Sequence, residues 1–304
     1  MTAASVNGIT IEYDVHGDEN APPLLLVMGL GGQLVGWPLE FVEQLAAAGP
    51  FRVIRYDNRD VGLSTHVDAP PPTLRQTLMA LVARRFARSS YVLSDMAADG
   101  IALLGHLGIE RAHLVGISMG GMIAQTMAIE HPARVASLTS IMSNTGDRKH
   151  GKIHRSLLRQ LPRMLRQRGR DGDPLERGVE MFRLISGPHF DEDAVRTMTK
   201  EALARSDDVE GTSRQMIAIA ASPDRTEGLG RVTAPTLVIH GLVDPLVKPD
   251  GGIATAKAVP GARLVMFPDM AHDLPRPRWS EIFGEIVENA GVRAGTPAAL
   301  ATDD

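Results

Sequence analysis

Residues 113–121 read His113-Leu-Val-Gly-Ile-Ser-Met-Gly-Gly121, an apolar run that ends in a glycine-rich turn around Ser118. The run predicts a buried strand, and residues 119–130 carry apolar positions three or four apart, as a helix does. A sharp strand-to-helix turn strains its central residue, and glycines two positions before and after Ser118 remove side chains that would clash. An incidental serine in a glycine-rich turn is the alternative, but the strand before it and the helix after it favour a nucleophile.

Apolar runs and helical patterns alternate along the rest of the chain. Buried strands are predicted at residues 24–28, 51–56, 135–142, 236–240 and 263–267, and an edge strand at residues 8–15. Helices are predicted at residues 37–48, 94–107 and 277–290. This alternation predicts an α/β fold with a mostly parallel, doubly wound sheet.

Two stretches interrupt the alternation and divide the chain. Residues 148–230, here called the inserted segment, are polar with helical patterns and lack buried-strand runs, which predicts a helical cap over one end of the sheet. Residues 64–90 predict an extra helical insertion. The core then comprises residues 1–147 and 231–292, and the Ala/Thr/Pro/Asp-rich residues 293–304 predict a disordered tail.

A serine hydroxyl needs a neighbouring base, and the base needs a carboxylate that orients it. In strand-to-helix serine sites of this kind the partners follow in the order serine, acid, histidine. Asp244 follows the strand at 236–240, and His272 follows the strand at 263–267. We therefore predict Asp244 as the acid and His272 as the base, although each residue considered alone is as consistent with a turn or a solvated loop.

Competing residues exist for both roles. Asp269 and Asp273 flank the predicted base, and His240 ends the strand before Asp244. The strand at 135–142 is followed by Ser143-Asn-Thr145 with no carboxylate before Asp147, which strengthens Asp244. His240 is expected to pack near the site rather than act as base.

Acyl transfer builds negative charge on a carbonyl oxygen, which fixed backbone amides stabilise. One predicted donor is the amide of Met119, the residue after the nucleophile. The second is the amide of Leu30, in a glycine-rich loop after the first buried strand that is otherwise read as a flexible connection. Gly29 in this loop and Trp37 beyond it are predicted to contact substrate.

Composition excludes several classes of protein. The chain has 304 residues, no cysteine and a net charge of -4, so no thiolate site exists and nucleic acid is a poor partner. No metal, phosphate or dinucleotide motif is found, and we expect no cofactor. The N-terminal residues lack a secretory pattern and no apolar run could span a bilayer, so we expect a cytoplasmic protein.

Two charged stretches have structural and functional interpretations. Asp57, Arg59 and Asp60 lie on a strand-end loop, where a structural network of paired charges is favoured over catalysis. Residues 148–170 hold nine Lys or Arg and no acid. A solvated face is favoured there, with weak contact to an anionic membrane surface as the alternative.

The ordered motifs resemble bacterial α/β-hydrolase esterases and lipases related to aclacinomycin methylesterase. They are Met28-Gly-Leu-Gly-Gly32 with Trp37, Arg55-Tyr-Asp-Asn-Arg-Asp60 with Gly62 and Ser64, Gly116-Ile-Ser-Met-Gly120, Gly241-Leu-Val-Asp-Pro245 and Met270-Ala-His-Asp273. The resemblance covers residues 8–147 and 231–290. It implies the triad Ser118, Asp244 and His272, main-chain donors at Leu30 and Met119, and ester hydrolysis without a cofactor.

The function predicted from these features is hydrolysis of a small-molecule carboxylic ester with a hydrophobic or lipid-like part, through an acyl-enzyme. Thioesters, phospholipids or C–C bonds are alternative substrates for the same triad. A ligand-binding sensor built on a hydrolase fold is the non-enzymatic alternative. The sequence leaves the oligomeric state open.

Overall fold

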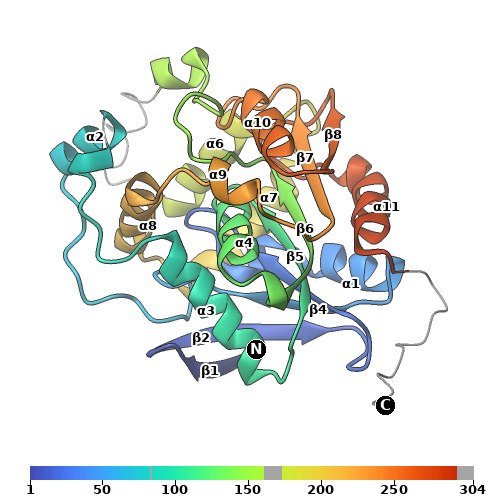
Figure 1. The fold of residues 1–304 in the computed structure, drawn as a ribbon. Coiled ribbons are helices and arrows are strands. Elements are labelled where there is room, and N and C mark those ends of the chain that lie inside the picture. Colours follow the sequence, from blue (N-terminus) through green and yellow to red (C-terminus); the bar gives the residue numbers. More distant parts are fainter. Residues whose placement is uncertain (83, 161–172, 293–304) are drawn as a thin grey trace.

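The computed structural model describes residues 1–82, 84–160 and 173–292 (Figure 1). The predicted tail at 293–304 lies outside this part of the chain, as do residues 161–172, which include the end of the basic stretch. The strands are β1 Thr2–Val6, β2 Ile9–His16, β3 Pro23–Val27, β4 Arg52–Tyr56, β5 Ala112–Ile117, β6 Val135–Ile141, β7 Thr236–Gly241 and β8 Arg263–Phe267.

Helices separate most of these strands. The α-helices are α1 Leu39–Ala48, α2 Leu74–Val82, α3 Leu93–His106, α4 Met119–Glu130, α6 Pro174–Ile185, α7 Glu192–Arg205, α8 Val209–Ala221, α9 Thr226–Leu229, α10 Asp250–Ala258 and α11 Trp279–Ala290. Short 3₁₀ helices are η1 Leu34–Gly36, η2 Arg84–Phe86, η3 Pro132–Arg134 and η4 Arg276–Arg278. Helix α10 was not predicted from the sequence.

The described strands form one eight-stranded sheet in the order β1-β2-β4-β3-β5-β6-β7-β8. Pairing is antiparallel between β1 and β2 and between β2 and β4, and parallel from β4 onward. The predicted α/β-hydrolase fold, with its mostly parallel, doubly wound sheet, is confirmed.

One assignment at the sheet edge was wrong. Residues 8–15 were expected as the edge strand, but β2 lies between β1 and β4, and β1 takes the edge. The two strands form a hairpin through Asn7 and Gly8, which have φ of 49° and 77°. A two-residue Asn-Gly link between strands is a strong hairpin signal, so the sequence did carry the information for β1.

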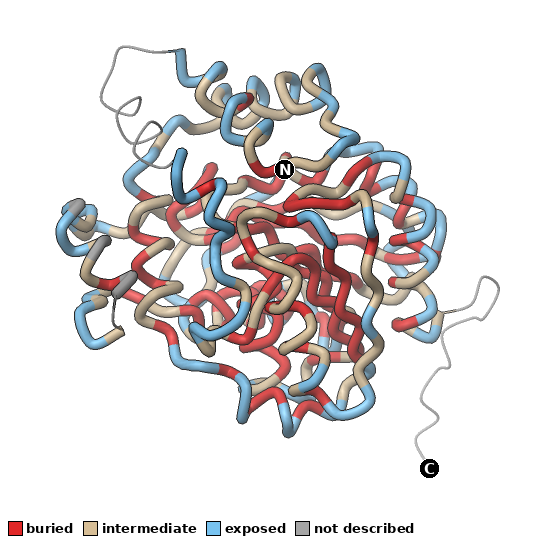
Figure 2. The backbone as a smooth tube through the Cα atoms, turned by 90° about the horizontal axis from the view of Figure 1, so that it is seen from above, coloured by how far each residue is buried: buried red, intermediate tan, exposed pale blue. Residues whose placement is uncertain are grey.

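The core lies on both faces of the sheet, as the alternation along β3 shows. Leu25 and Val27 pack into a cluster with α3 and α4, whereas Leu24 and Leu26 pack into a second cluster with α1 and α11. Figure 2 shows the resulting concentration of buried backbone through the middle of the molecule. Because both faces are covered, polar side chains that bind or react must gather at the strand ends.

The inserted segment connects β6 to β7, and its described helices are α6, α7, α8 and α9. Helix α7 contacts η1, and α8 contacts α2 and η2 from the 64–90 stretch (Figure 1). The backbone amide of His272 donates to the carbonyl of Ile185 at the end of α6 at 3.0 Å. Described helices of the inserted segment therefore contact loops at the carboxyl ends of the strands.

Candidate active site

Ser118 stands between β5 and α4 with φ 54° and ψ −120°, in the left-handed half of backbone space that ordinary residues avoid. A Cβ on Gly116 would lie 2.2 Å from the carbonyl oxygen of Gly120, so this turn closes only without a side chain there. The amide of Ser118 donates to Ile141 at 2.9 Å, and the hydroxyl of Ser143 donates to the carbonyl of Ser118 at 2.8 Å. These contacts with β6 and its following loop hold the strained turn in place.

The three residues predicted as a triad lie together. Nε2 of His272 is 3.0 Å from Oγ of Ser118, and Nδ1 of His272 is 2.8 Å from Oδ2 of Asp244. They follow β5, β7 and β8, whose carboxyl ends share one edge of the sheet. A proton can therefore pass from the hydroxyl to Nε2 while the carboxylate holds the proton on Nδ1.

The carboxylate of Asp244 is buried and fully hydrogen-bonded. Its Oδ1 accepts from the amides of Leu246 and Val247 at 2.8 and 2.9 Å. Burial acts to raise its pKa, but the charge of His272, hydrogen bonds from His240 and His272, and the amide of Val247 lower the pKa to about 2. Asp244 is therefore ionised wherever His272 could act as a base.

His240 packs behind this carboxylate and is completely buried. Its Nε2 lies 2.8 Å from the carbonyl of Val247 and 3.4 Å from Oδ2 of Asp244. Both neighbours are acceptors, so Nε2 carries the hydrogen. His240 therefore packs next to Asp244, on the side away from the hydrogen bond between Ser118 and His272. This position agrees with the expectation that His240 packs near the site.

The competing carboxylates contact other groups. Asp269 pairs with Arg278 at 3.0 Å and with His189 at 2.8 Å. Asp273 accepts from the amides of Ala271 and Gly187 at 3.0 and 3.1 Å, and its burial raises its pKa. Neither carboxylate is hydrogen-bonded to the His272 ring.

The glycine-rich loop after β3 lies directly beside Ser118. β3 and β5 are paired with Val27 opposite Gly116, and a Cβ on Gly29 would lie 3.2 Å from the Cβ of Ser118. Within the described residues, the amides of Leu30 and Met119 donate no hydrogen bond to another protein group. Both amides are thus available for an oxygen bound next to Ser118.

Trp37, which the sequence predicted to contact substrate, is buried in the hydrophobic core. Its side chain is 0% exposed, and its ring packs on Phe41 with centroids 5.4 Å apart in the core beneath α1. Its carbonyl accepts a hydrogen bond from Arg55. Trp37 therefore supports the region after the glycine-rich loop, and of the two residues predicted to contact substrate only Gly29 lies against Ser118.

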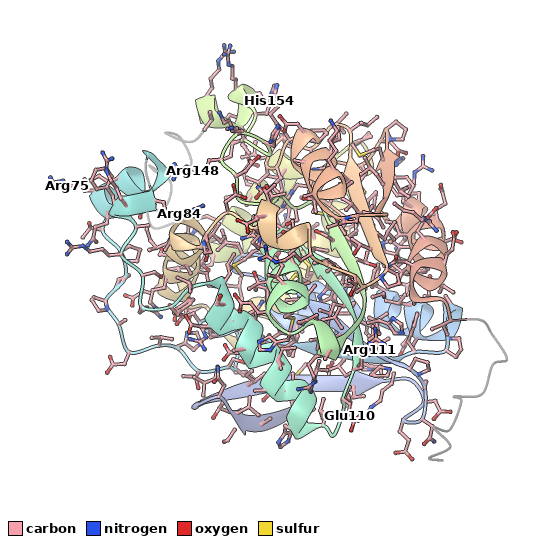
Figure 3. The ribbon with its side chains drawn as sticks, viewed as in Figure 1. Arg75, Arg84, Glu110, Arg111, Arg148 and His154 are labelled. Atoms are coloured by element: carbon pink, nitrogen blue, oxygen red, sulfur yellow. The ribbon has the colours of Figure 1, made fainter. Side chains whose placement is uncertain are left out.

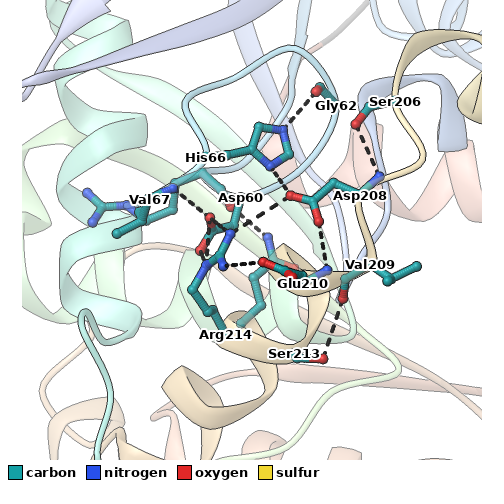
Figure 4. Close-up of polar contacts among 12 residues, drawn as sticks. Asp60, Gly62, His66, Val67, Ser206, Asp208, Val209, Glu210, Ser213 and Arg214 are labelled. Atoms are coloured by element: carbon teal, nitrogen blue, oxygen red, sulfur yellow. Dashed lines mark hydrogen bonds and ion pairs between the residues drawn. The ribbon is translucent and has the colours of Figure 1, made fainter. Parts of the chain in front are cut away.

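The charged loop after β4 is a structural network, as predicted. Arg59 binds Asp99 through two hydrogen bonds of 2.6 and 2.7 Å. Asp60 is buried and accepts from Tyr91 at 2.6 Å and from Arg214 of α8 (Figure 4). Asp57 is also buried and pairs with Arg205.

The sequence did not reveal which residues of the inserted segment reach the site. The amide of Gly31 donates to Oε1 of Gln215 at 2.9 Å, and a Cβ on Gly31 would lie 2.8 Å from Oγ1 of Thr212. Nε2 of Gln33 donates to the carbonyls of Ala202 and Ser206 at 2.9 and 3.0 Å. No local pattern signals such contacts, because their partners are separated by more than 160 residues.

Among the described residues, no group of three or more His, Asp or Glu side chains is arranged to hold a metal ion. None of the described helices is both long and apolar enough to cross a membrane.

The part of the chain that holds the predicted triad matches a known protein family. A family model for the alpha/beta hydrolase fold matches residues 22–275, which include β3 to β8 and all three residues of the predicted triad. The chain belongs to the α/β-hydrolase family.

This α/β-hydrolase is 33% identical to the rhodomycin D methylesterase of Streptomyces peucetius over 288 residues, covering 88% of this chain and 90% of the relative. It is 28% identical to a 2-hydroxy-6-oxononadienedioate/2-hydroxy-6-oxononatrienedioate hydrolase of Cupriavidus pinatubonensis, covering 86% of this chain and 85% of the relative. Among solved structures, the enol-lactonase of Burkholderia xenovorans matches with TM-score 0.71 and 24% identity, covering 95% of this chain and all of that one. The structural likeness supports the fold of this α/β-hydrolase.

Proposed function

We propose that this α/β-hydrolase cleaves carboxylic esters through an acyl-enzyme on Ser118. The observation that carries the proposal is the unbroken chain of hydrogen bonds from Ser118 through His272 to Asp244. An activated nucleophile needs a base within hydrogen-bond reach and a group that orients the base, and these contacts meet both conditions. The 33% sequence identity to rhodomycin D methylesterase supports an ester as the substrate.

In the proposed reaction, Oγ of Ser118 attacks the ester carbonyl while Nε2 of His272 takes its proton. The resulting oxyanion accepts hydrogen bonds from the amides of Leu30 and Met119, and Met119 also begins α4, whose N-terminal end favours negative charge. His272 then gives its proton to the leaving alcohol, and Ser118 remains acylated. Water that loses its proton to His272 releases the acid and restores the serine.

The test of this mechanism is labelling by a fluorophosphonate, which forms a stable adduct with an activated serine. We expect one label per chain in the wild type and none in Ser118→Ala. The matched control is Ser213→Ala, because the hydroxyl of Ser213 donates to the carbonyl of Val209 in its own helix and does not support the serine turn. Full labelling of Ser118→Ala would move the nucleophile elsewhere.

The substrate class is proposed to be small and hydrophobic or lipid-like, with thioesters, phospholipids and C–C bonds as alternatives. The Cupriavidus relative is named as a 2-hydroxy-6-oxononadienedioate hydrolase. Because of this relative, we keep C–C bond hydrolysis as an alternative. A series of nitrophenyl esters from acetate to laurate, with an acyl-CoA beside it, separates short-chain esters from lipid-like esters and from thioesters. A ligand-binding sensor predicts tight binding of a small molecule and turnover of none of these compounds.

Membrane-surface contact and a cytoplasmic location stay as proposals. Nη1 of Arg148 donates to the carbonyl of Ala80 at 3.4 Å, and Nη2 of Arg84 donates to that of Gly146 at 3.2 Å, so the start of the basic stretch lies beside α2 and η2 (Figure 3). Phe86, Ile153 and Leu158 are exposed in these stretches. Co-sedimentation with phosphatidylglycerol vesicles, compared with phosphatidylcholine vesicles, tests the contact.

A further inference from the structure

Gln215 connects the inserted segment to the loop beside Ser118. It lies on α8 and is completely buried. Its Oε1 accepts from the amide of Gly31 at 2.9 Å, and its Nε2 donates to the carbonyl of Arg59 at 2.8 Å. One side chain thereby joins three segments that are distant in the sequence.

The two contacts fix the orientation of the carboxamide. A carbonyl oxygen only accepts, so the NH₂ group of Gln215 must face Arg59 and its oxygen must face Gly31. On the other side, the loop closes its own turn, because the amide of Gly32 donates to the carbonyl of Gly29 at 3.1 Å. Gln215 therefore holds a tight turn that contains Leu30, the proposed oxyanion donor.

Helix α8 has two further anchors that do not involve Gln215, and both precede it in the sequence (Figure 4). Arg214 binds the buried carboxylate of Asp60 through hydrogen bonds of 2.9 to 3.1 Å. Asp208, which caps the helix, lies 2.5 Å from Nδ1 of His66. Because these contacts remain when the carboxamide is changed, a substitution at Gln215 should free the loop without displacing the helix.

We propose that Gln215 is a positioning residue that sets the glycine-rich loop for oxyanion stabilisation, an inference that rests on the proposed ester hydrolysis. Leu30 must point its amide at an oxygen that becomes negative only as the reaction proceeds. If the loop is not held in place, the Leu30 amide no longer points at the oxyanion, and the transition state loses this hydrogen bond. Binding of the substrate in the ground state is little affected. The expected signature is therefore a fall in kcat with KM almost unchanged.

The first test is Gln215→Met, which keeps the length of the side chain and removes both hydrogen bonds. We expect kcat for a nitrophenyl ester to fall about tenfold, with KM within about twofold of wild type. The affinity for a phenylboronic acid, which forms a tetrahedral anionic adduct on serine, should fall in parallel. Ser213→Ala is the matched control on the same helix, since its hydroxyl contacts only the helix carbonyl of Val209.

The second test is Gln215→Glu, which restores the original hydrogen-bonding pattern only when the acid is protonated. A protonated Glu can donate to Arg59 and accept from Gly31, whereas the carboxylate cannot donate and puts negative charge beside the oxyanion. Burial raises the pKa of a carboxylic acid, which brings its protonation into the range where activity can be measured. The ratio of variant to wild-type kcat should rise as the pH falls from about 8 to about 5.

Each outcome decides the matter. A lower kcat in Gln215→Met, an intact Ser213→Ala and a pH-dependent recovery of Gln215→Glu support the inference. Should Gln215→Met fail to fold, the ratio measured for Gln215→Glu decides alone, and a ratio that does not change with pH overturns the proposal. Unchanged kcat in an active background defeats this inference only, whereas absence of Ser118-dependent turnover in the wild type defeats the proposed function as well.

Discussion

Arg205 at the end of α7 and Asp57 after β4 form a buried, bidentate ion pair between the inserted segment and the core. Nη2 of Arg205 is 2.6 Å from Oδ2 of Asp57, and Nη1 is 3.2 Å from Oδ1. The side chain of Asp57 is 0% exposed and that of Arg205 is 11% exposed. Asp57 also accepts from the amide of Leu34 at 2.6 Å, so the pair lies next to the chain that leaves the glycine-rich loop.

Arg205→Met should destabilise the protein by about 3 kcal/mol, because it leaves the carboxylate of Asp57 buried without its cation. Urea unfolding measures the change. The matched control is Arg231→Met, since Arg231 and its partner Glu227 are 66% and 92% exposed and should contribute nothing measurable. Equal effects of the two substitutions would contradict a special role for the buried pair.

Adding Asp57→Asn to Arg205→Met should recover part of the lost stability. The neutral amide no longer needs a cation, although it keeps an oxygen for the amide of Leu34. A double-mutant cycle gives the coupling energy between the two residues. Strict additivity of the two changes would show that the pair is not coupled.

Asp244→Asn should lower kcat by about 10⁴-fold with little change in KM, because the amide no longer holds His272 in the tautomer that accepts a proton at Nε2. Steady-state kinetics on a nitrophenyl ester measures it. Asp269→Asn is the control: Asp269 lies three residues before His272 in the same loop, but it pairs with Arg278 and His189. Loss of activity in the control instead would transfer the acid role to Asp269.

The stability should depend on pH through Asp244. Its pKa is lowered to about 2 in the folded state, below the roughly 3.9 of an unfolded aspartate, so the native state favours the ionised form. This contribution of about 2 kcal/mol is present above about pH 4 and is lost as the pH falls toward about 2. Urea unfolding of wild type and Asp244→Asn across this range should show the wild type losing more, and parallel curves would contradict the prediction.

Gly120→Ala should prevent the native turn from forming. A Cβ on Gly120 would lie 2.0 Å from the carbonyl oxygen of Val27, in backbone that cannot move without breaking β3. Gly284→Ala is the opposite case, since it lies inside α11 with nothing within 4 Å of an added Cβ. It should stabilise the protein by about 0.5–1 kcal/mol in thermal or urea unfolding. Soluble, active Gly120→Ala protein would show that the turn tolerates a side chain.

Local patterns predicted most of the sheet because buried parallel strands are written as short apolar runs. The runs at 113–117 and 236–240 fall on β5 and β7, so the sequence alone places the residues just after them at one edge of the sheet. Helix α10 was not predicted because Gly251 and Gly252 lie in its first turn, where they weaken the helical pattern. In β1, Ala3 to Ser5 carry little strand preference of their own, and pairing with β2 supplies it.

The position of Ser118, Asp244 and His272 relative to one another could be inferred because each follows the carboxyl end of a core strand. The surroundings of Leu30 could not, because they depend on which helix of the inserted segment packs over the glycine-rich loop. Gln215 is an ordinary polar residue by sequence, and its burial follows only from the packing of α8. Side-chain contacts between remote segments are decided by tertiary packing, which spacing along the chain does not encode.

The register of β6 and β7 has a consequence for engineering and divergence. The chain leaves the sheet for the inserted segment at the carboxyl end of β6, after Ile141, and re-enters it at the amino end of β7, where Thr236 is paired with Leu138. The connection therefore also crosses back to the other end of the strands. A shorter or longer connection that keeps this crossover could replace the present one while every strand pairing of the sheet stayed intact. Such a graft would be free to reshape the entrance for a new substrate, provided that it again supplied a cation for Asp57 and an acceptor for Gly31.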